Sequence, residues 1–183
     1  GRPQGSPLHG YTNGERLHVT LKEVLHQATA ALSSHGVDEP RLESELLLMD
    51  VLEVGRAQLY ADLEQELSPG NKQCFWQFVQ RRCNHEPTAY ILRHCEFFGV
   101  DFFIDPRALI PRSGSELLFE KSLKLAAQHP VKKHHPFLIA EGGAGSGAIA
   151  VTLALHLPNT KIYAIDISAP ALEVAVIICQ RHK

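Results

Sequence analysis

A glycine-rich loop between two short apolar segments is the part of the sequence whose residue types could carry chemistry. One apolar run begins at Phe137 and leads into Glu141, glycines alternate with other residues up to Gly147, and an apolar segment with helical character follows. A second run starts at Lys161 and ends in Asp166. This order is typical of the first β-α-β unit of a nucleotide-binding, Rossmann-like domain. Asp166 would then accept hydrogen bonds from the ribose hydroxyls of an adenosine-containing cofactor.

The loop fits two classes of cofactor. Gly143-x-Gly145-x-x-Ala148 satisfies the loose pattern of dinucleotide sites. Gly143-x-Gly145-x-Gly147, preceded by Glu141, fits S-adenosylmethionine better, because that ligand is cationic and needs no pyrophosphate cradle. The segment carries no lysine or arginine for a phosphate. The sequence therefore favours S-adenosylmethionine, and the alternatives are a dinucleotide or a glycine-rich turn without a ligand. The predicted cofactor-binding residues are Glu141, Gly143, Gly145, Gly147 and Asp166.

Further motifs surround the loop in a fixed order. They are His85-Glu-Pro-Thr-Ala-Tyr-Ile91, Glu96-Phe-Phe-Gly99, Leu109-Ile-Pro-Arg112-Ser-Gly-Ser-Glu116, Ala164-Ile-Asp166-Ile-Ser168 and Ala171-Leu-Glu-Val-Ala175. With these motifs the sequence closely resembles the HemK/PrmC family of peptide chain release factor glutamine methyltransferases. The resemblance is specific from His85 onward and only architectural from about Leu17.

The resemblance implies an α/β protein with an N-terminal all-α helical bundle, a β-hairpin linker and the start of a Rossmann-like class I methyltransferase domain. The expected ranges are a disordered leader at 1–16, the bundle at 17–92, the linker at 93–110 and the methyltransferase part at 111–183. The implied reaction is methylation of the glutamine side-chain amide in the Gly-Gly-Gln motif of a class 1 release factor, with S-adenosylmethionine as cofactor. The resemblance also implies that Arg112 and Glu116 border the site.

The sequence departs from the family pattern in ways that bear on the chemistry. Glu141 replaces an aspartate, Gly142 removes a core aliphatic side chain, and Ala144 removes a hydroxyl or thiol. The family's Asn-Pro-Pro-Tyr motif, which orients the poorly nucleophilic amide nitrogen, does not occur up to Lys183. We therefore expect the N-terminal part of a family member, with no catalytic residue assigned and no methyl transfer by this part alone.

Two other functions stay open at this point. One is a DNA adenine amino-methyltransferase, and the other is a degenerate module that binds cofactor or release factor without activity. The formal net charge of −2 over 183 residues gives no electrostatic case for nucleic acid. The four cysteines show no zinc spacing, and no third ligand lies near His134 and His135. With no apolar run long enough for a membrane, we expect a cytoplasmic protein, or one of an organelle matrix.

Caps and apolar spacing predict the helices of the bundle. Thr20-Leu-Lys-Glu23 is a capping box, and the helix that it opens stops at Gly36. A second helix is predicted over 41–52, ended by Gly55, with an apolar side made of Leu42, Leu46, Met49 and Leu52. Ser68-Pro69 opens a third helix, and a short fourth one is predicted over 87–92.

The second half is predicted to hold a hairpin and a parallel strand pair. The hairpin covers 95–104, and a second capping box at Ser113-Gly-Ser-Glu116 opens a helix to about Gln128. Strands are predicted at 137–140 and 162–165, parallel neighbours joined by a helix over 147–157. A sheet of so few strands would leave apolar helix residues without much of their burial. Those residues are Val151, Leu153, Leu155, Val174 and Ile177.

Overall fold

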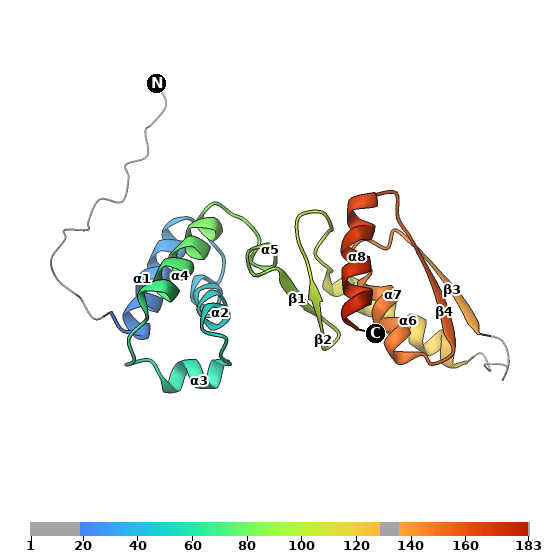
Figure 1. Ribbon diagram of the computed structural model, residues 1–183, viewed down its shortest axis with the longest axis horizontal. Coiled ribbons are helices and arrows are strands. Elements are labelled where there is room, and N and C mark those ends of the chain that lie inside the picture. Colours follow the sequence, from blue (N-terminus) through green and yellow to red (C-terminus); the bar gives the residue numbers. More distant parts are fainter. Residues whose placement is uncertain (1–18, 129–135, 183) are drawn as a thin grey trace, which may run out of the picture. The chain divides into compact units, whose positions relative to one another are not determined.

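The computed structural model describes residues 19–128 and 136–182. The chain divides into two compact units between Cys83 and Asn84 (Figure 1). The predicted leader at 1–16 and the His134–His135 pair lie outside the described residues.

The first unit is helical. Its helices are α1 (Leu21–Ser34), α2 (Pro40–Leu52), α3 (Arg56–Ala61) and α4 (Pro69–Cys83). The predicted capping box opens α1, because Thr20 Oγ1 accepts from the backbone N–H of Glu23 at 3.3 Å and Glu23 Oε2 accepts from that of Thr20 at 3.0 Å. Ser68 Oγ likewise accepts from the N–H of Asn71 at 3.2 Å in the first turn of α4. Both sequence-predicted helix starts are confirmed.

Three helices of this unit, α1, α2 and α4, pack on one another around an apolar core. Its buried side chains include Leu21, Val24, Ala28, Leu32, Leu47, Leu48, Leu59, Phe75 and Val79. The predicted apolar side of α2 is wrong. The helix buries Ser44, Glu45, Leu47 and Leu48 instead. Leucines occur around most of α2, so spacing alone could not select the buried face.

A buried carboxylate explains the face that α2 turns inward. Glu45 is only 2% exposed, and its Oε1 accepts from the hydroxyl of Tyr60 and from Arg41 Nε at 3.1 Å. Its Oε2 lies 2.8 Å from Arg56 Nη2. Burial alone would raise the pKa of Glu45, but these hydrogen bonds and the Arg56 charge hold it below its usual value. The cluster ties α2 to α3.

The sequence did not predict α3, and the predicted end of α2 needs a correction. Glu53, in the left-handed conformation with φ of 55°, follows the last helical residue of α2. Gly55 is instead the residue that precedes α3. A left-handed residue other than glycine or asparagine is an uncommon helix end, so the glycine two positions later was the stronger signal in the sequence.

The second unit combines helices with two small sheets. Its elements are α5 (Thr88–Leu92), β1 (His94–Phe97), β2 (Val100–Phe103), α6 (Ser113–Ala127), β3 (Phe137–Gly142), α7 (Ala148–His156), β4 (Thr160–Ile165) and α8 (Ala169–Arg181). β1 and β2 form the predicted antiparallel hairpin. β3 and β4 are parallel neighbours joined by α7, and their register runs from the pair Phe137 and Thr160 to the pair Gly142 and Ile165. Both predictions of pairing are confirmed.

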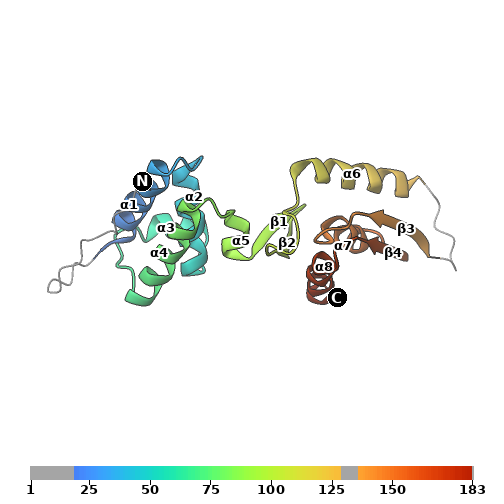
Figure 2. The ribbon, with the colours of Figure 1, turned by 90° about the horizontal axis from the view of Figure 1, so that it is seen from above.

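The core of this unit lies between the hairpin and the helices. α7 lies between α6 and α8 (Figure 2). The hairpin contributes Phe97 and Phe102, and the helices contribute Phe119, Val151, Leu153, Val174 and Ile178. The prediction that Val151, Leu153 and Val174 lose their burial is therefore wrong, because neighbouring helices and the hairpin cover them. Ile177 is half-buried, and for Leu155, which is 46% exposed, the prediction is confirmed. Apolar side chains are also exposed on the strands, where Leu138 and Ile165 are 61% and 59% exposed.

The predicted capping box at the start of α6 is also wrong. Arg112 has the extended backbone of an N-cap residue, with φ of −105° and ψ of 156°, and no side chain caps the helix. Ser113 is already the first helical residue, which puts Glu116 at the fourth helical position. The reciprocal hydrogen bonds of a capping box need the glutamate at the third position.

Candidate functional site

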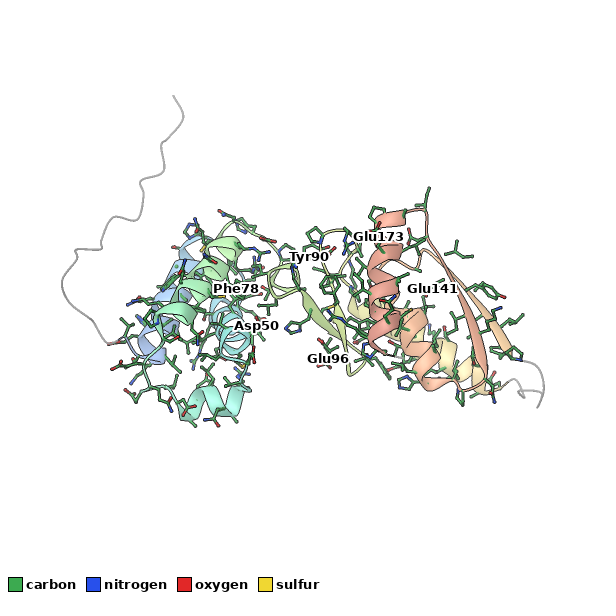
Figure 3. All side chains as sticks on the ribbon, in the orientation of Figure 1. Asp50, Phe78, Tyr90, Glu96, Glu141 and Glu173 are labelled. Atoms are coloured by element: carbon green, nitrogen blue, oxygen red, sulfur yellow. The ribbon has the colours of Figure 1, made fainter. Side chains whose placement is uncertain are left out.

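The predicted cofactor residues come together where β3 and β4 end. Glu141 and Gly142 are the last residues of β3 (Figure 3), the glycine loop follows them, and Asp166 comes directly after β4. Because the strands are parallel, their carboxyl ends lie at the same edge of the sheet. In open α/β sheets this edge is where ligands bind.

Backbone conformation requires glycine at three positions of the loop. Gly143, Gly145 and Gly147 have φ of 75°, 54° and 79°. A Cβ added to Gly147 would lie 2.9 Å from Ala175 Cβ, so this glycine lets α7 approach α8 closely. A Cβ on Gly143 or Gly145 would meet no atom within 4 Å. The first two glycines therefore face open space, and the third is a packing residue.

Hydrogen bonds fix the loop to the end of β4. The backbone N–H groups of Gly143 and Ala144 donate to the carbonyl oxygen of Ile165 at 2.8 Å and 3.0 Å. Asp166 Oδ2 accepts from the N–H of Gly145 at 2.7 Å, and its Oδ1 accepts from the N–H of Ser168 at 2.8 Å. Asp166 thus links the glycine loop to the start of α8. Each carboxylate oxygen keeps a second lone pair for a ligand.

The two acidic groups have opposite pKa shifts. The backbone N–H groups of Ser168 and Gly145 lower the pKa of Asp166, so this carboxyl stays ionised. Burial raises the pKa of Glu141, and the charge of Asp166 adds to the rise, while the backbone N–H of Ala150 opposes it. Glu141 Oε2 is buried and accepts no hydrogen bond from the described residues. A half-buried carboxyl with an unused oxygen is stabilised in its ionised form by a nearby cation or donor.

Arg112 and Glu116 have a less defined place. They lie at the start of α6, and no hydrogen bond or ion pair joins either one to the glycine loop within the described residues. Their position at the border of the site stays a prediction. The sequence analysis did not predict the capping role of Ser168, whose Oγ accepts from the N–H of Ala171 at 3.3 Å at the start of α8. A serine followed two residues later by Pro170 is the sequence pattern that could have indicated this cap.

Several other site types are not found in residues 19–128 and 136–182. No group of three or more histidine, cysteine or acidic side chains in these ranges could hold a metal ion. None of the helices described is long and apolar enough to cross a bilayer. The four cysteines are unpaired, and burial raises the pKa of the Cys95 thiol to about 11.

Known proteins match most of the chain. Residues 23–92 match the family model of the PrmC N-terminal domain. A release factor glutamine methyltransferase of Moorella thermoacetica is 41% identical over 157 residues, which cover 86% of this chain and 54% of the relative. The proteins of the same name from Koribacter versatilis and Chlorobaculum tepidum are each 40% identical, over 86% and 85% of this chain and 54% and 53% of the relatives.

These proteins are named methyltransferases, and the similarity of the chain to them identifies it as related to methyltransferases. More particularly, it is a relative of the release factor glutamine methyltransferases, and its helical part matches the PrmC N-terminal domain. The family resemblance predicted from the motifs is thereby confirmed. The chain spans about half the length of the curated relatives that it matches.

Proposed function

We propose that residues 1–183 are the substrate-docking and cofactor-binding part of a release factor glutamine methyltransferase. The parallel β3-α7-β4 unit is, in this proposal, the start of a Rossmann-like class I methyltransferase domain. The observation that carries the proposal is the hydrogen bond from the glycine loop to Asp166, which brings the loop and both acidic groups to one sheet edge. The similarity to proteins named release factor glutamine methyltransferase supports it.

The residues at this edge fit S-adenosylmethionine. Gly143 and Gly145 leave open space over the loop, where a ligand can approach the backbone. Asp166 would accept from the ribose hydroxyls with its remaining lone pairs, and Glu141 would face the cationic methionine portion. The bound cofactor supplies an electrophilic methyl group on a sulfonium. Glu141 and Asp166 hold and orient that ligand, and no residue is assigned to proton transfer.

A dinucleotide fits the same residues less well. Its pyrophosphate would meet two carboxyl groups, and the loop from 141 to 147 contains no lysine or arginine to neutralise phosphate charge. The unused oxygen of Glu141 is an acceptor, whereas a phosphate needs donors. The charge balance therefore favours a cationic ligand over an anionic one.

The helical unit would provide contacts to a protein substrate, a class 1 release factor, away from the reacting glutamine. The match of residues 23–92 to the PrmC N-terminal domain supports this role. A partner in translation termination would place the protein in the cytoplasm or in an organelle matrix.

A pull-down with a class 1 release factor tests the docking role. The chain from 19 to 183 should retain the release factor, and removal of the helical unit should strongly reduce retention. S-adenosylmethionine binding by the shortened chain, measured in parallel, checks that the second unit is still folded. Full retention of the release factor by residues 93–183 would contradict the role proposed for the helical unit.

A further inference from the structure

The outer face of the hairpin carries a cleft that the proposed cofactor site does not use. Alternation along the strands divides the hairpin, with Phe97 and Phe102 in the core and His94 and Phe103 paired on the opposite face. An open cleft of about 530 Å³ lies over that face. It is lined by Leu92, Arg93, His94, Asp101, Phe103 and Arg181, all of the second unit.

Two arginines give the cleft its charge. The guanidinium of Arg181, in the last turn of α8, lies 5.0 Å from the centre of the Phe103 ring. Arg93 occupies the junction between α5 and β1 with φ of 62°, an uncommon conformation for a side chain of this size. Within the part of the chain that the structure describes, neither arginine forms an ion pair with a carboxylate.

Arg107 of the same unit, in contrast, is paired with carboxylates of the chain. Its guanidinium bonds to Asp105 at 2.7 Å and to Glu173 of α8 at 2.8 Å. These two carboxylates account for its charge and join the segment after the hairpin to α8. Arg107 is the main cause of the lowered pKa of Asp105, and the charge of Arg93 adds to this effect without forming an ion pair. Arg181 has no carboxylate partner within the described residues.

The acidic residue of the cleft is already engaged. Asp101 Oδ1 lies 3.2 Å from Nδ1 of His94, and its carbonyl oxygen lies 2.9 Å from Nε2 of His182. Glu96 pairs with Asp101 across the strands but does not line the cleft. The lining therefore has two arginines against one carboxylate, and that carboxylate has a histidine partner.

We propose that this cleft docks an acidic segment of a protein partner, with a Glu or Asp carboxylate held between Arg93 and Arg181. Arginine suits this ligand because a guanidinium stacked on an aromatic ring still presents its N–H groups edge-on to a carboxylate. Leu92 and the Phe103 ring give the neighbouring apolar atoms of the segment a contact surface. The identification of that partner as a release factor rests on the proposed function, whereas the acidic chemistry rests on the cleft itself.

The test uses the full chain and two double variants. R93A/R181A removes both charges of the cleft, and K121A/K124A removes two exposed charges from α6 as a matched control. Binding is measured for a fluorescein-labelled Glu-Glu-Phe-Glu-Glu peptide and for a class 1 release factor. S-adenosylmethionine binding and circular dichroism establish that each variant is folded.

We expect R93A/R181A to weaken binding of the acidic peptide and of the release factor by roughly tenfold or more, the change that loss of one charge-assisted pair produces. K121A/K124A should stay within about twofold. Unchanged peptide binding by a folded R93A/R181A overturns the proposal, as does inorganic phosphate that binds the cleft as tightly as the peptide. If a release factor binds wild type and R93A/R181A equally, the proposal for the cleft is overturned but the proposed function is not. If the chain binds the peptide but neither a release factor nor the cofactor, the proposed function is contradicted instead.

Discussion

Asp166 Oδ2 accepts a hydrogen bond from the backbone N–H of Gly145 at 2.7 Å. The acid predicted to hold a ribose is therefore also the residue that fixes the glycine loop to the end of β4. Its other oxygen accepts from the N–H of Ser168, before α8. One side chain thus sets the shape of the loop and offers its remaining lone pairs at the same edge, so loop geometry and ligand binding depend on each other.

Replacing Asp166 should affect both functions at once. In Asp166→Ala the N–H groups of Gly145 and Ser168 lose their acceptor, so the variant should melt at a lower temperature and bind S-adenosylmethionine at least roughly tenfold more weakly. Calorimetry and thermal melts measure the two effects. Ser168→Ala is the control, since it loses only a helix cap, about 1 kcal/mol, and should keep cofactor affinity. Normal affinity in folded Asp166→Ala would count against the ribose role.

Two glycines of the loop should respond differently to the same substitution. Gly147→Ala combines a left-handed backbone with a Cβ 2.9 Å from Ala175, so we expect a loss of about 2–4 kcal/mol in unfolding free energy. Gly143→Ala meets only the backbone penalty, about 1 kcal/mol, but fills space over the loop and should weaken cofactor binding. Urea unfolding and calorimetry separate the two. Equal stability losses would show that Ala175 does not restrict Gly147.

The raised pKa of Glu141 makes a prediction about pH. Because the folded state holds this proton more tightly than the unfolded chain, the carboxyl contributes stability below its unfolded pKa, about 4.3, and loses that contribution as the pH rises through the folded pKa. Glu141→Gln should therefore be more stable than wild type at about pH 7 and similar to it at about pH 4. The measurement is the difference in melting temperature between the two proteins at each pH. Asp166 has the opposite pH dependence, but it is present in both proteins and therefore cancels from this difference. The same difference at both pH values would contradict the burial of an ionisable group here.

Hydrogen exchange should distinguish the strands from the helices that cover them. Amides of α1 and α2 should exchange slowly, because their helices share a buried core. In the second unit, amides of α7 should also exchange slowly. Amides of β4 should exchange faster, because β4 pairs only with β3 within the described residues and has exposed side chains at Tyr163 and Ile165. Amides of β4 as slow as those of α1 would contradict this order.

The sequence predicted those features that depend on local chemistry. The capping box of α1, the serine cap of α4, the hairpin turn and the parallel pair around the glycine loop follow from residues close together in the chain. The buried side of α2 could not be predicted, because it depends on Tyr60 and Arg56 of a helix that the sequence did not reveal. The burial of Val151 and Val174 likewise depends on tertiary contacts with the hairpin and other helices.

The site was predicted as a set of residues but not as a geometry. Glycine spacing and the acid after β4 are visible in the sequence. The hydrogen bond from Gly145 to Asp166 and the close contact of Gly147 with Ala175 require the fold. The separate roles of the three glycines could therefore not be read from their spacing.

The most direct test of the central claim is calorimetric titration of the chain with S-adenosylmethionine and, under identical conditions, with NAD. We expect S-adenosylmethionine to bind more tightly, because Glu141 and Asp166 complement a cation and the loop has no basic residue for a pyrophosphate. Glu141→Gln should reduce this preference by weakening S-adenosylmethionine more than NAD. Tighter binding of NAD, or equal binding of the two, would contradict the assignment of the glycine loop to a methyltransferase.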